Sequence, residues 1–283
     1  MPAYFRNWMP DDSAFKDANG VVLKRYAAPL GKQYTPTQIA QAALEYYDRW
    51  LIDKDPKLAA SDKAAFLIQI DWLLKNQLRD GRWLFNFKWG HMKPPWWSAM
   101  TEGVAMSALL RAYSITGDPY CLSAITKART TFERDRDHDH GVATPVPVGS
   151  KTYIVYEEYL GSYGAPNVLN GWIFSMVGLY EAATYLHDDV AMADLTAPDR
   201  GFAALKVLLP YYDAGTWTHY YITTPGTLQR GRLQTVLYHK LVIGQLMYLT
   251  KITGDPFFTK WATKFQGYLN ACNAAGHCPP SGG

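Results

Sequence analysis

The stretch RAYSITGDPYCLSAITKA, residues 111–128, returns in pattern near the end of the chain as YLTKITGDPFFTKWATKF, residues 248–265. Each copy places Thr-Gly-Asp-Pro between two segments with helical spacing of apolar residues. The glycine can adopt the left-handed conformation that ends a helix. The aspartate can cap the next helix through its side-chain oxygens, and the proline fits the first helical position, where no N–H is needed. Each copy therefore predicts a helix, a tight turn and a second helix that runs back.

Helical periodicity extends this organisation to the rest of the chain. Pro36 opens one helical stretch, Ser61 and Asp62 start another, and residues 170–186 and 201–209 read as a further pair. About eight helices in four hairpins predict an all-α fold, an (α/α) toroid or incomplete barrel. An ordinary α-solenoid is the alternative.

Three segments interrupt the predicted helices with β-type alternation, aromatic residues, Gly and Pro. They are residues 81–97, 140–163 and 215–231, and we interpret them as β-hairpin-like insertions at the cleft. Long ordered loops often carry function. The chain then divides into an irregular N-terminal segment, 1–30, and a single (α/α) toroid catalytic domain, 31–283.

The composition narrows the classes of ligand. The 283 residues are 48% hydrophobic, as in a globular protein with a sizeable core. Only 19% are charged, the net charge is +3 and no dense basic stripe occurs, so we expect no nucleic-acid partner. The 20 Tyr and 10 Trp indicate either a large aromatic core or a sugar-binding cleft, since both side chains combine an apolar face with a polar edge.

The chain shows no sign of membrane insertion. It lacks a run of about 18 apolar residues, so we expect no membrane span. Its N-terminus has no basic segment followed by an apolar one, so we expect no signal peptide and leave the compartment open.

Cys121 reads as a core residue, and Cys272 and Cys278 are either paired or free. The chain is also compatible with a homodimer.

Several familiar sites are missing from the sequence. It has no P-loop, no dinucleotide fingerprint, no CxxC pair and no G-x-S-x-G elbow, and we expect neither a cofactor nor a metal. The acidic and histidine residues at 135–140 read as a solvated turn. The pair Trp96-Trp97 is either core or a sugar platform, and Ser98 is a plausible helix cap. Glu158 and Tyr159 follow an extended stretch and would point in opposite directions unless the strand ends before them.

Five segments that cover most of the chain follow one another in the order of a known family. They are YTPTQIAQAALEYY (34–47), WWSAMTEGVAMSALLRAYSITGD (96–118), YEEYLGSYGAPNVLNGWIFSMVGLYE (156–181), LPYYDAGTWTHYY (209–221) and LYHKLVIGQL (237–246). The combination of YEEY, VLNG and GLYE is highly specific. The chain resembles the C-terminal domain of the glucuronyl C5-epimerases, which convert D-glucuronate to L-iduronate in heparan-type chains. The resemblance implies the toroid fold and a short, bacterial-type member without the β-rich regions that precede this domain in animal members.

The resemblance places the family's catalytic tyrosines on Tyr159, Tyr220 and Tyr238, with Glu158 as the acidic residue beside the first. Such an enzyme removes the C5 proton of a uronate in an acidic polysaccharide and returns a proton on the opposite face. It therefore needs a base, an acid and donors around the substrate carboxylate. A free Tyr has a pKa of about 10, so a cationic neighbour would have to lower that pKa if a Tyr is the base.

The other substrate-binding candidates are assigned by chemistry. The charged or titratable ones are Arg230, Arg232, Lys88 and His239, and the remaining ones are Asn170, Gln38 and Trp97. Which tyrosine is acid and which is base stays open.

Three alternative functions remain at this stage. A polysaccharide lyase shares the first step but expels the group at C4. A glycoside hydrolase needs two carboxylates facing one bond, for which Glu102, Glu157 and Glu158 are available. A non-catalytic glycan-binding module is the alternative from a different class.

Overall fold

Helices dominate the computed structural model, which describes residues 15–161, 164, 166–186, 196–223 and 229–279. Within these ranges lie eight α-helices, which confirm the predicted helical fold. They are α1 (Pro36–Ile52), α2 (Pro56–Asn76), α3 (Ala99–Thr116), α4 (Pro119–Thr130), α5 (Leu169–Tyr185), α6 (Thr196–Leu208), α7 (Val236–Thr253) and α8 (Pro256–Ala274), with a short 3-10 helix, Leu209–Tyr212, after α6.

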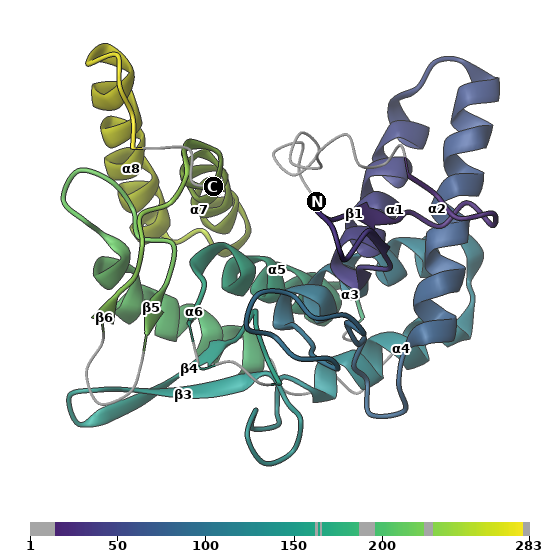
Figure 1. The fold of residues 1–283 in the computed structure, drawn as a ribbon, viewed down its shortest axis with the longest axis horizontal. Coiled ribbons are helices and arrows are strands. Elements are labelled where there is room, and N and C mark those ends of the chain that lie inside the picture. Colours follow the sequence, from purple (N-terminus) through teal and green to yellow (C-terminus); the bar gives the residue numbers. More distant parts are fainter. Residues whose placement is uncertain (1–14, 162–163, 165, 187–195, 224–228, 280–283) are drawn as a thin grey trace.

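The helices are arranged as four hairpins in series. The odd-numbered helices α1, α3, α5 and α7 pack side by side in that order, and each packs against the even-numbered helix that follows it. The first and last hairpins stand at opposite ends, with α3 and α5 between them (Figure 1). The described helices thus form an open (α/α) toroid rather than a closed barrel.

The two Thr-Gly-Asp-Pro turns have the predicted geometry. Gly117 and Gly254 are left-handed, with φ of 68° and 69°. The Asp118 side chain accepts a hydrogen bond from the backbone of α4 at 2.9 Å, and that of Asp255 does the same for α8 at 2.9 Å. Local chemistry therefore sets the α3–α4 and α7–α8 hairpins.

Two predicted helix starts are wrong. Helix α2 begins at Pro56 rather than at Ser61 and Asp62, because Asp55 accepts a hydrogen bond from the Lys57 N–H at 2.8 Å and caps it. The Asp-Pro pair there is the same signal as in the two repeated turns. Asp62 lies inside the helix and forms an ion pair with Arg49 of α1 at 2.9 Å. Helix α6 likewise begins at residue 196, before the predicted start at 201.

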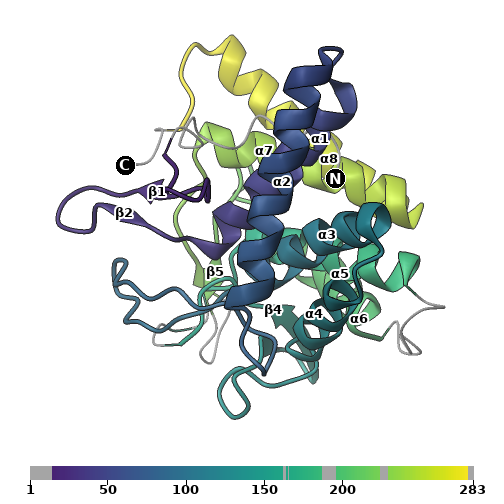
Figure 2. The ribbon, with the colours of Figure 1, turned by 90° about the vertical axis from the view of Figure 1, so that its right-hand side faces the viewer.

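The predicted β-hairpins form in two of the three interrupting segments, whereas the segment 81–97 has isolated β-bridges instead of strands, and one further hairpin precedes α1. Antiparallel pairs form between β1 (Lys24–Arg25) and β2 (Lys32–Gln33), β3 (Ala143–Val148) and β4 (Lys151–Tyr156), and β5 (Ile222–Thr223) and β6 (Gln229–Arg230). Figure 2 shows the β1–β2 hairpin, the loop after α2 and β5 on one side of the molecule. Residues 1–14 of the predicted N-terminal segment lie outside the described residues, as do 162–163 and 224–228 of two insertions.

Close contact between α3 and α5 holds the centre of the toroid together. A Cβ atom on Gly103 would lie 2.5 Å from Ser175 Cα, and one on Gly178 would lie 1.9 Å from the Gly103 carbonyl oxygen. Only glycine allows these backbones to approach so closely. Arg111 of α3 forms an ion pair with the buried Glu181 of α5 at 2.9 Å.

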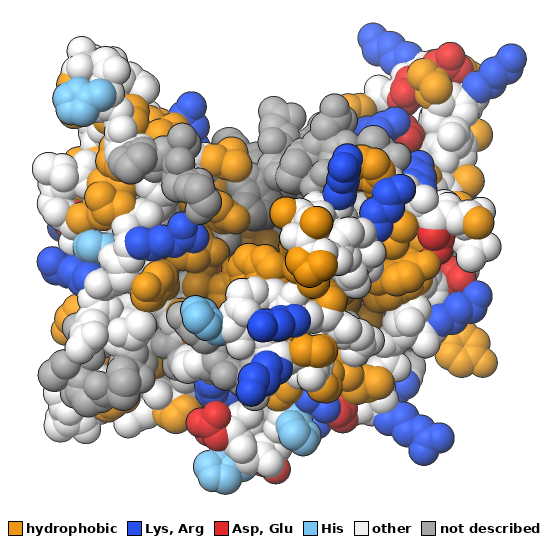
Figure 3. All heavy atoms as spheres, in the orientation of Figure 1, with side chains coloured by type: hydrophobic (Ala, Val, Ile, Leu, Met, Phe, Trp, Pro, Cys, Tyr) orange, Lys and Arg blue, Asp and Glu red, His pale blue; other side chains and the backbone are white. Residues whose placement is uncertain are grey.

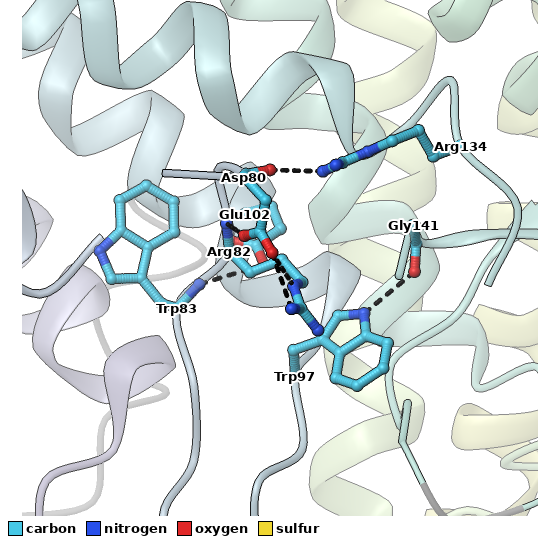
Figure 4. A network of polar contacts seen from close by, with 7 residues as sticks. All are labelled: Asp80, Arg82, Trp83, Trp97, Glu102, Arg134 and Gly141. Carbon is cyan, nitrogen blue, oxygen red and sulfur yellow. Dashed lines mark hydrogen bonds and ion pairs between the residues drawn. The ribbon is translucent and has the colours of Figure 1, made fainter. Parts of the chain in front are cut away.

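A polar network anchors the insertion 81–97 to the toroid (Figure 4). Arg82 contacts Asp80 at 2.7 Å, and the Trp83 N–H donates to Glu102 in the first turn of α3 at 3.4 Å. Arg134 donates to the Asp80 carbonyl oxygen. The network fixes one end of the insertion, so the aromatic residues that follow have defined positions.

The structure confirms the prediction for Cys121 and pairs the two cysteines that the sequence left open. Cys121 is buried in the core, as predicted, and Cys272 and Cys278 form a disulfide with a Cα–Cα distance of 5.0 Å. Among the described residues, no helix combines the length and apolar character needed to cross a membrane.

Candidate active site

Two adjoining cavities form one cleft beside the insertions. Their volumes are about 460 Å³ and about 440 Å³, and both are lined by Trp89 and Tyr159. Tyr220, Tyr221 and Arg232 belong to the first cavity, whereas Gln38, Glu158 and Tyr238 belong to the second. Figure 3 shows hydrophobic side chains exposed in a hollow of the face, with Lys and Arg around them.

The cleft lies at the amino-terminal ends of the odd-numbered helices. Its lining includes Gln38 from the first turn of α1, Met100 from α3, Val168 at the start of α5 and Tyr238 from α7. Helix amino termini carry partial positive charge and unpaired N–H groups. Four such ends around one cleft favour a negatively charged ligand.

The structure brings together the three tyrosines from distant parts of the chain. The Tyr159 and Tyr220 hydroxyl oxygens are 3.4 Å apart. The rings of Tyr220 and Tyr238 meet edge to face, with centroids 5.2 Å apart and planes at 68°. Tyr238 reaches this position because Thr235 caps α7 and accepts a hydrogen bond from its N–H at 3.3 Å.

Glu158 and Tyr159 both reach the cleft because strand β4 ends before them, at Tyr156. The intervening Glu157 is buried and accepts hydrogen bonds from the Tyr159 N–H at 3.1 Å and the Asn167 N–H at 2.8 Å. This turn abolishes the alternation that would send consecutive side chains to opposite faces. Glu157 therefore shapes the backbone, and Glu158 is the carboxylate that lines the cleft.

The Glu158 carboxyl is enclosed and incompletely paired. Its side chain is buried, and its Oε2 atom has no hydrogen-bond partner. Burial raises the pKa of Glu158 to about 8, even though a hydrogen bond from Tyr159 acts in the opposite direction. A carboxyl with this pKa exchanges protons near neutral pH, as a general base must.

Gly171 in the first turn of α5 makes room for this carboxyl. A Cβ atom at Gly171 would lie only 2.1 Å from Glu158 Oε2. The glycine of the VLNG segment is therefore required by the position of Glu158, not by a turn.

We predict that Gly171→Ala lowers activity at least tenfold while the fold persists, because alanine suits a helix but displaces the carboxylate. Turnover and thermal unfolding measured on the same variant test this. Gly267→Ala in α8, where a Cβ would meet nothing within 4 Å, is the matched control. Unchanged turnover in Gly171→Ala would show that the position of Glu158 does not matter.

All three tyrosines favour the protonated form. Burial is the main cause that raises the pKa of each, to about 12 for Tyr238 and well above 10 for Tyr159 and Tyr220, and the nearby Glu158 adds to it. Arg232 acts against this for Tyr220 and Tyr238, but burial outweighs it. A lowered tyrosine pKa, considered from the sequence, is thus not found for these three side chains. The tyrosines are suited to donate protons.

The basic candidates lie at different places. The Arg232 guanidinium lies over the Tyr220 ring, 4.7 Å from its centroid, and lines the cleft. Arg230 on β6 and Lys88 in the insertion are exposed and line neither cavity. The structure therefore brings Arg232 to the tyrosines and leaves the other two outside.

His239 does not reach the cleft. It is buried, its Nδ1 lies 2.7 Å from Thr218 Oγ1 and its Nε2 lies 2.9 Å from the Phe265 carbonyl oxygen. Its ring also stacks on Trp217, with centroids 3.8 Å apart. Burial lowers the pKa of His239 to about 4, so it is neutral and holds α7 against α8.

The uncharged candidates are also divided. Gln38 lines the cleft, and both its amide atoms are buried without a hydrogen-bond partner. Asn170 is buried beside the cleft but lines neither cavity. Trp97 donates to the Gly141 carbonyl oxygen at 3.0 Å and stacks against Arg82, so it belongs to the core (Figure 4).

The sequence left Trp96 open as core or sugar platform, and it missed Trp89, the other tryptophan of the cleft wall. Both line the cleft, and Trp89 stacks on Tyr159 with centroids 5.4 Å apart. Phe85 stacks beneath Trp96 at 3.7 Å. The aromatic residues of the 81–97 insertion were the available signal, but alternation alone does not tell which face meets the cleft.

Acid–base chemistry is within reach of this arrangement. Four groups that carry exchangeable protons meet in one partly enclosed space with an aromatic wall and a cation. In the described part of the chain, no group of three His, Cys, Asp or Glu side chains is placed to hold a metal ion.

Fold and site together define an open (α/α) toroid domain with a tyrosine-rich, acid–base cleft. The family described as D-glucuronyl C5-epimerase C-terminus matches residues 76–267, and the chain belongs to this family. It is 30% identical to the D-glucuronyl C5-epimerase of Caenorhabditis elegans over 219 residues. This aligned region covers 72% of this chain and 35% of the nematode protein. The chain is also 24% identical over 284 residues to an uncharacterized protein of Methanocaldococcus jannaschii, at 93% and 87% coverage. The chain thus spans about a third of the length of its nematode relative.

Proposed function

We propose that this protein is a polysaccharide glucuronyl C5-epimerase, which removes the C5 proton of D-glucuronate in a polymer and returns a proton on the opposite face. The observation that carries the proposal is the meeting of Glu158 with Tyr159, Tyr220 and Tyr238 in one cleft. Family membership and the similarity to the nematode epimerase support it.

Glu158 acts as the base in this proposal. Its carboxylate takes the C5 proton, and the electron pair of the C–H bond spreads onto the substrate carboxylate. The Tyr238 hydroxyl then delivers its proton to C5 from the opposite face and becomes a phenolate. Glu158 and Tyr238 suit these roles because both line the same cavity, Glu158 in contact with Tyr159 and Tyr238 in contact with Tyr220.

The remaining tyrosines return the site to its starting state. The proton held by Glu158 passes to the Tyr238 phenolate through Tyr159 and Tyr220, whose hydroxyl oxygens are 3.4 Å apart. Protons and charge then balance over one cycle, and no cofactor is consumed. The same path runs in reverse for L-iduronate, with Tyr238 as base and Glu158 as acid.

The substrate carboxylate lies near Arg232 in this arrangement. The intermediate carries more negative charge on that carboxylate than the substrate does, so positive charge and N–H donors around it lower the barrier. Arg232 and the four helix amino termini supply both. Trp89, which is 39% exposed, provides an apolar surface for the sugar ring, and the buried Trp96 packs behind it.

The alternative reactions have less support. Neither the family nor the nematode relative favours a polysaccharide lyase. A glycoside hydrolase needs two carboxylates across one bond, yet Glu102 and Glu157 are buried outside both cavities.

The decisive experiment is incubation with uronate polymers in heavy water, followed by NMR. Deuterium at C5 together with L-iduronate signals would establish the epimerase. Unsaturated chain ends would show a lyase. If the protein binds the polymer but gives neither signal, it is a glycan-binding module.

We predict that Arg232→Ala lowers kcat/KM about ten- to a hundredfold, because a cation beside the developing charge stabilises the transition state. The kcat/KM of Arg230→Ala should stay within about twofold of the parent value, since an exposed side chain outside the cleft contributes little to the reaction. Steady-state kinetics on one uronate polymer compare the two. Equal rates for both variants and the parent would place the carboxylate elsewhere.

A further inference from the structure

A further cavity of about 580 Å³ lies outside the cleft, between β2, the carboxyl-terminal end of α2 and the start of the 81–97 insertion. Tyr34 and Trp72 form one wall. Their ring planes are only 18° apart, with centroids separated by 5.8 Å, and Tyr34 is 43% exposed. Two nearly parallel rings on an accessible surface offer a broad apolar face with polar edges.

Amide side chains surround these rings in fixed positions. Gln33 donates to the Leu30 carbonyl oxygen at 2.6 Å, and Asn76 donates to that of Trp72 at 2.8 Å. Gln77 is held by two backbone carbonyl oxygens, at 2.8 Å and 3.1 Å. Both N–H groups of Gln77 are thus used, Gln33 and Asn76 each use one, and among the described residues no donor occupies the three amide oxygens. The cavity presents positioned acceptors for hydroxyl groups.

The charged side chain that lines this cavity is paired, and the tyrosine hydroxyl is occupied. Lys75 pairs with Asp71 at 2.7 Å, and the Tyr34 hydroxyl donates to Asp17 at 2.7 Å. The ligand that fits has an apolar face and several hydroxyl groups, as a pyranose ring does. This differs from the cleft, where Arg232 and the helix amino termini favour a carboxylate.

One layer of side chains separates this cavity from the cleft. Phe87 lines the cavity, and its ring packs against Tyr26 and Trp96, with centroids 5.1 Å and 5.9 Å away. Tyr26 and Trp96 line the cleft. A polymer with one residue in the cleft therefore has other residues near the cavity.

We infer that this cavity is a second sugar-binding subsite, which holds a pyranose residue of the polymer by its ring face and hydroxyl groups while another residue occupies the cleft. The inference rests on the proposed function, because that function makes the ligand a polysaccharide. The subsite increases the affinity for long chains through multivalent attachment and leaves the chemical step unchanged.

The test compares long uronate polymer with a tetrasaccharide of the same polymer. Trp72→Ala should raise KM about tenfold for the polymer, with unchanged kcat and unchanged KM for the tetrasaccharide. Asn86→Ala, an exposed cavity residue, should shift KM in the same direction by about threefold without affecting folding. Tyr120→Ala, which removes an aromatic side chain that is 74% exposed on α4, is the control.

Salt separates this subsite from the cleft. The KM ratio of Trp72→Ala to parent should be equal at low and high salt, because no net charge is recognised. Equal KM changes on polymer and tetrasaccharide, or no change in a folded Trp72→Ala together with Asn86→Ala, would overturn the inference.

Binding measurements separate the subsite from the proposed reaction. In gels that contain the uronate polymer, the parent protein should be retarded and Trp72→Ala less so, whether or not C5 exchange occurs. Retardation without exchange would refute the epimerase proposal alone. No retardation of the parent by any uronate polymer would refute the subsite as well.

Discussion

Tyr238→Phe is expected to lower the rate of C5 exchange at least about a hundredfold, with little change in substrate affinity. The substitution removes only the hydroxyl, so the edge-to-face contact with Tyr220 remains while the proton donor is lost. Positioned general acids and bases typically contribute a hundred- to ten-thousandfold. The rate of C5 exchange should fall by a similar factor in Tyr159→Phe, because this substitution removes the hydroxyl contact to Tyr220.

The matched control for these variants is Tyr153→Phe, on the strand that leads to Tyr159 and outside both cavities. Initial rates in heavy water, with thermal unfolding of each variant, make the comparison. Near-normal exchange in Tyr238→Phe would reassign that residue to packing.

Glu158→Gln is expected to lower exchange about a hundredfold or more and to remove the rise of activity with pH. The base must be ionised to take the C5 proton, and burial raises the pKa of Glu158 to about 8. For the parent, kcat/KM should therefore rise with pH and level off above about pH 8. Glutamine has the same size but does not ionise. The residual kcat/KM of Glu158→Gln should therefore not change with pH up to about pH 8.

The same pKa makes a separate prediction for stability. The folded pKa lies above the ordinary value of 4.5, so across the range from 4.5 to about 8 the unfolded chain releases a proton that the folded chain retains. The contribution of Glu158 to stability is thus lost as pH rises. Glu158→Gln removes this loss and should be at least as stable as the parent at pH 8.

Thermal unfolding of the parent and of Glu158→Gln at pH 5 and pH 8 tests this stability prediction. Glu133→Gln, at an exposed carboxylate that pairs with Arg129, is the control for both measurements. Retained activity in Glu158→Gln with an unchanged pH profile would assign the base to another group. Joint loss of activity and stability at pH 8 would instead indicate a structural role.

The sequence by itself determined two of the hairpins, α3–α4 and α7–α8. Left-handed glycines, aspartate caps and first-position prolines act within four residues of one another, so their effect is readable without the rest of the chain. The missed start of α2 carried the same Asp-Pro signal at Asp55 and was overlooked rather than absent. The motifs around Tyr159, Tyr220 and Tyr238 were also readable, because their order along the chain matches a family.

Only the tertiary structure decided which side chains face the cleft. Trp96 and Trp97 are neighbours in sequence, yet one lines the cleft and the other packs in the core under Arg82. Arg230 and Arg232 likewise separate, and His239 turns into the core beside Tyr238.

Packing between distant segments also set the chemistry of Glu158. Its pKa follows from burial against Gly171, thirteen residues further along the chain, and from the turn made by Glu157. Burial is a property of the assembled helices and insertions, so no local pattern of residues could reveal it.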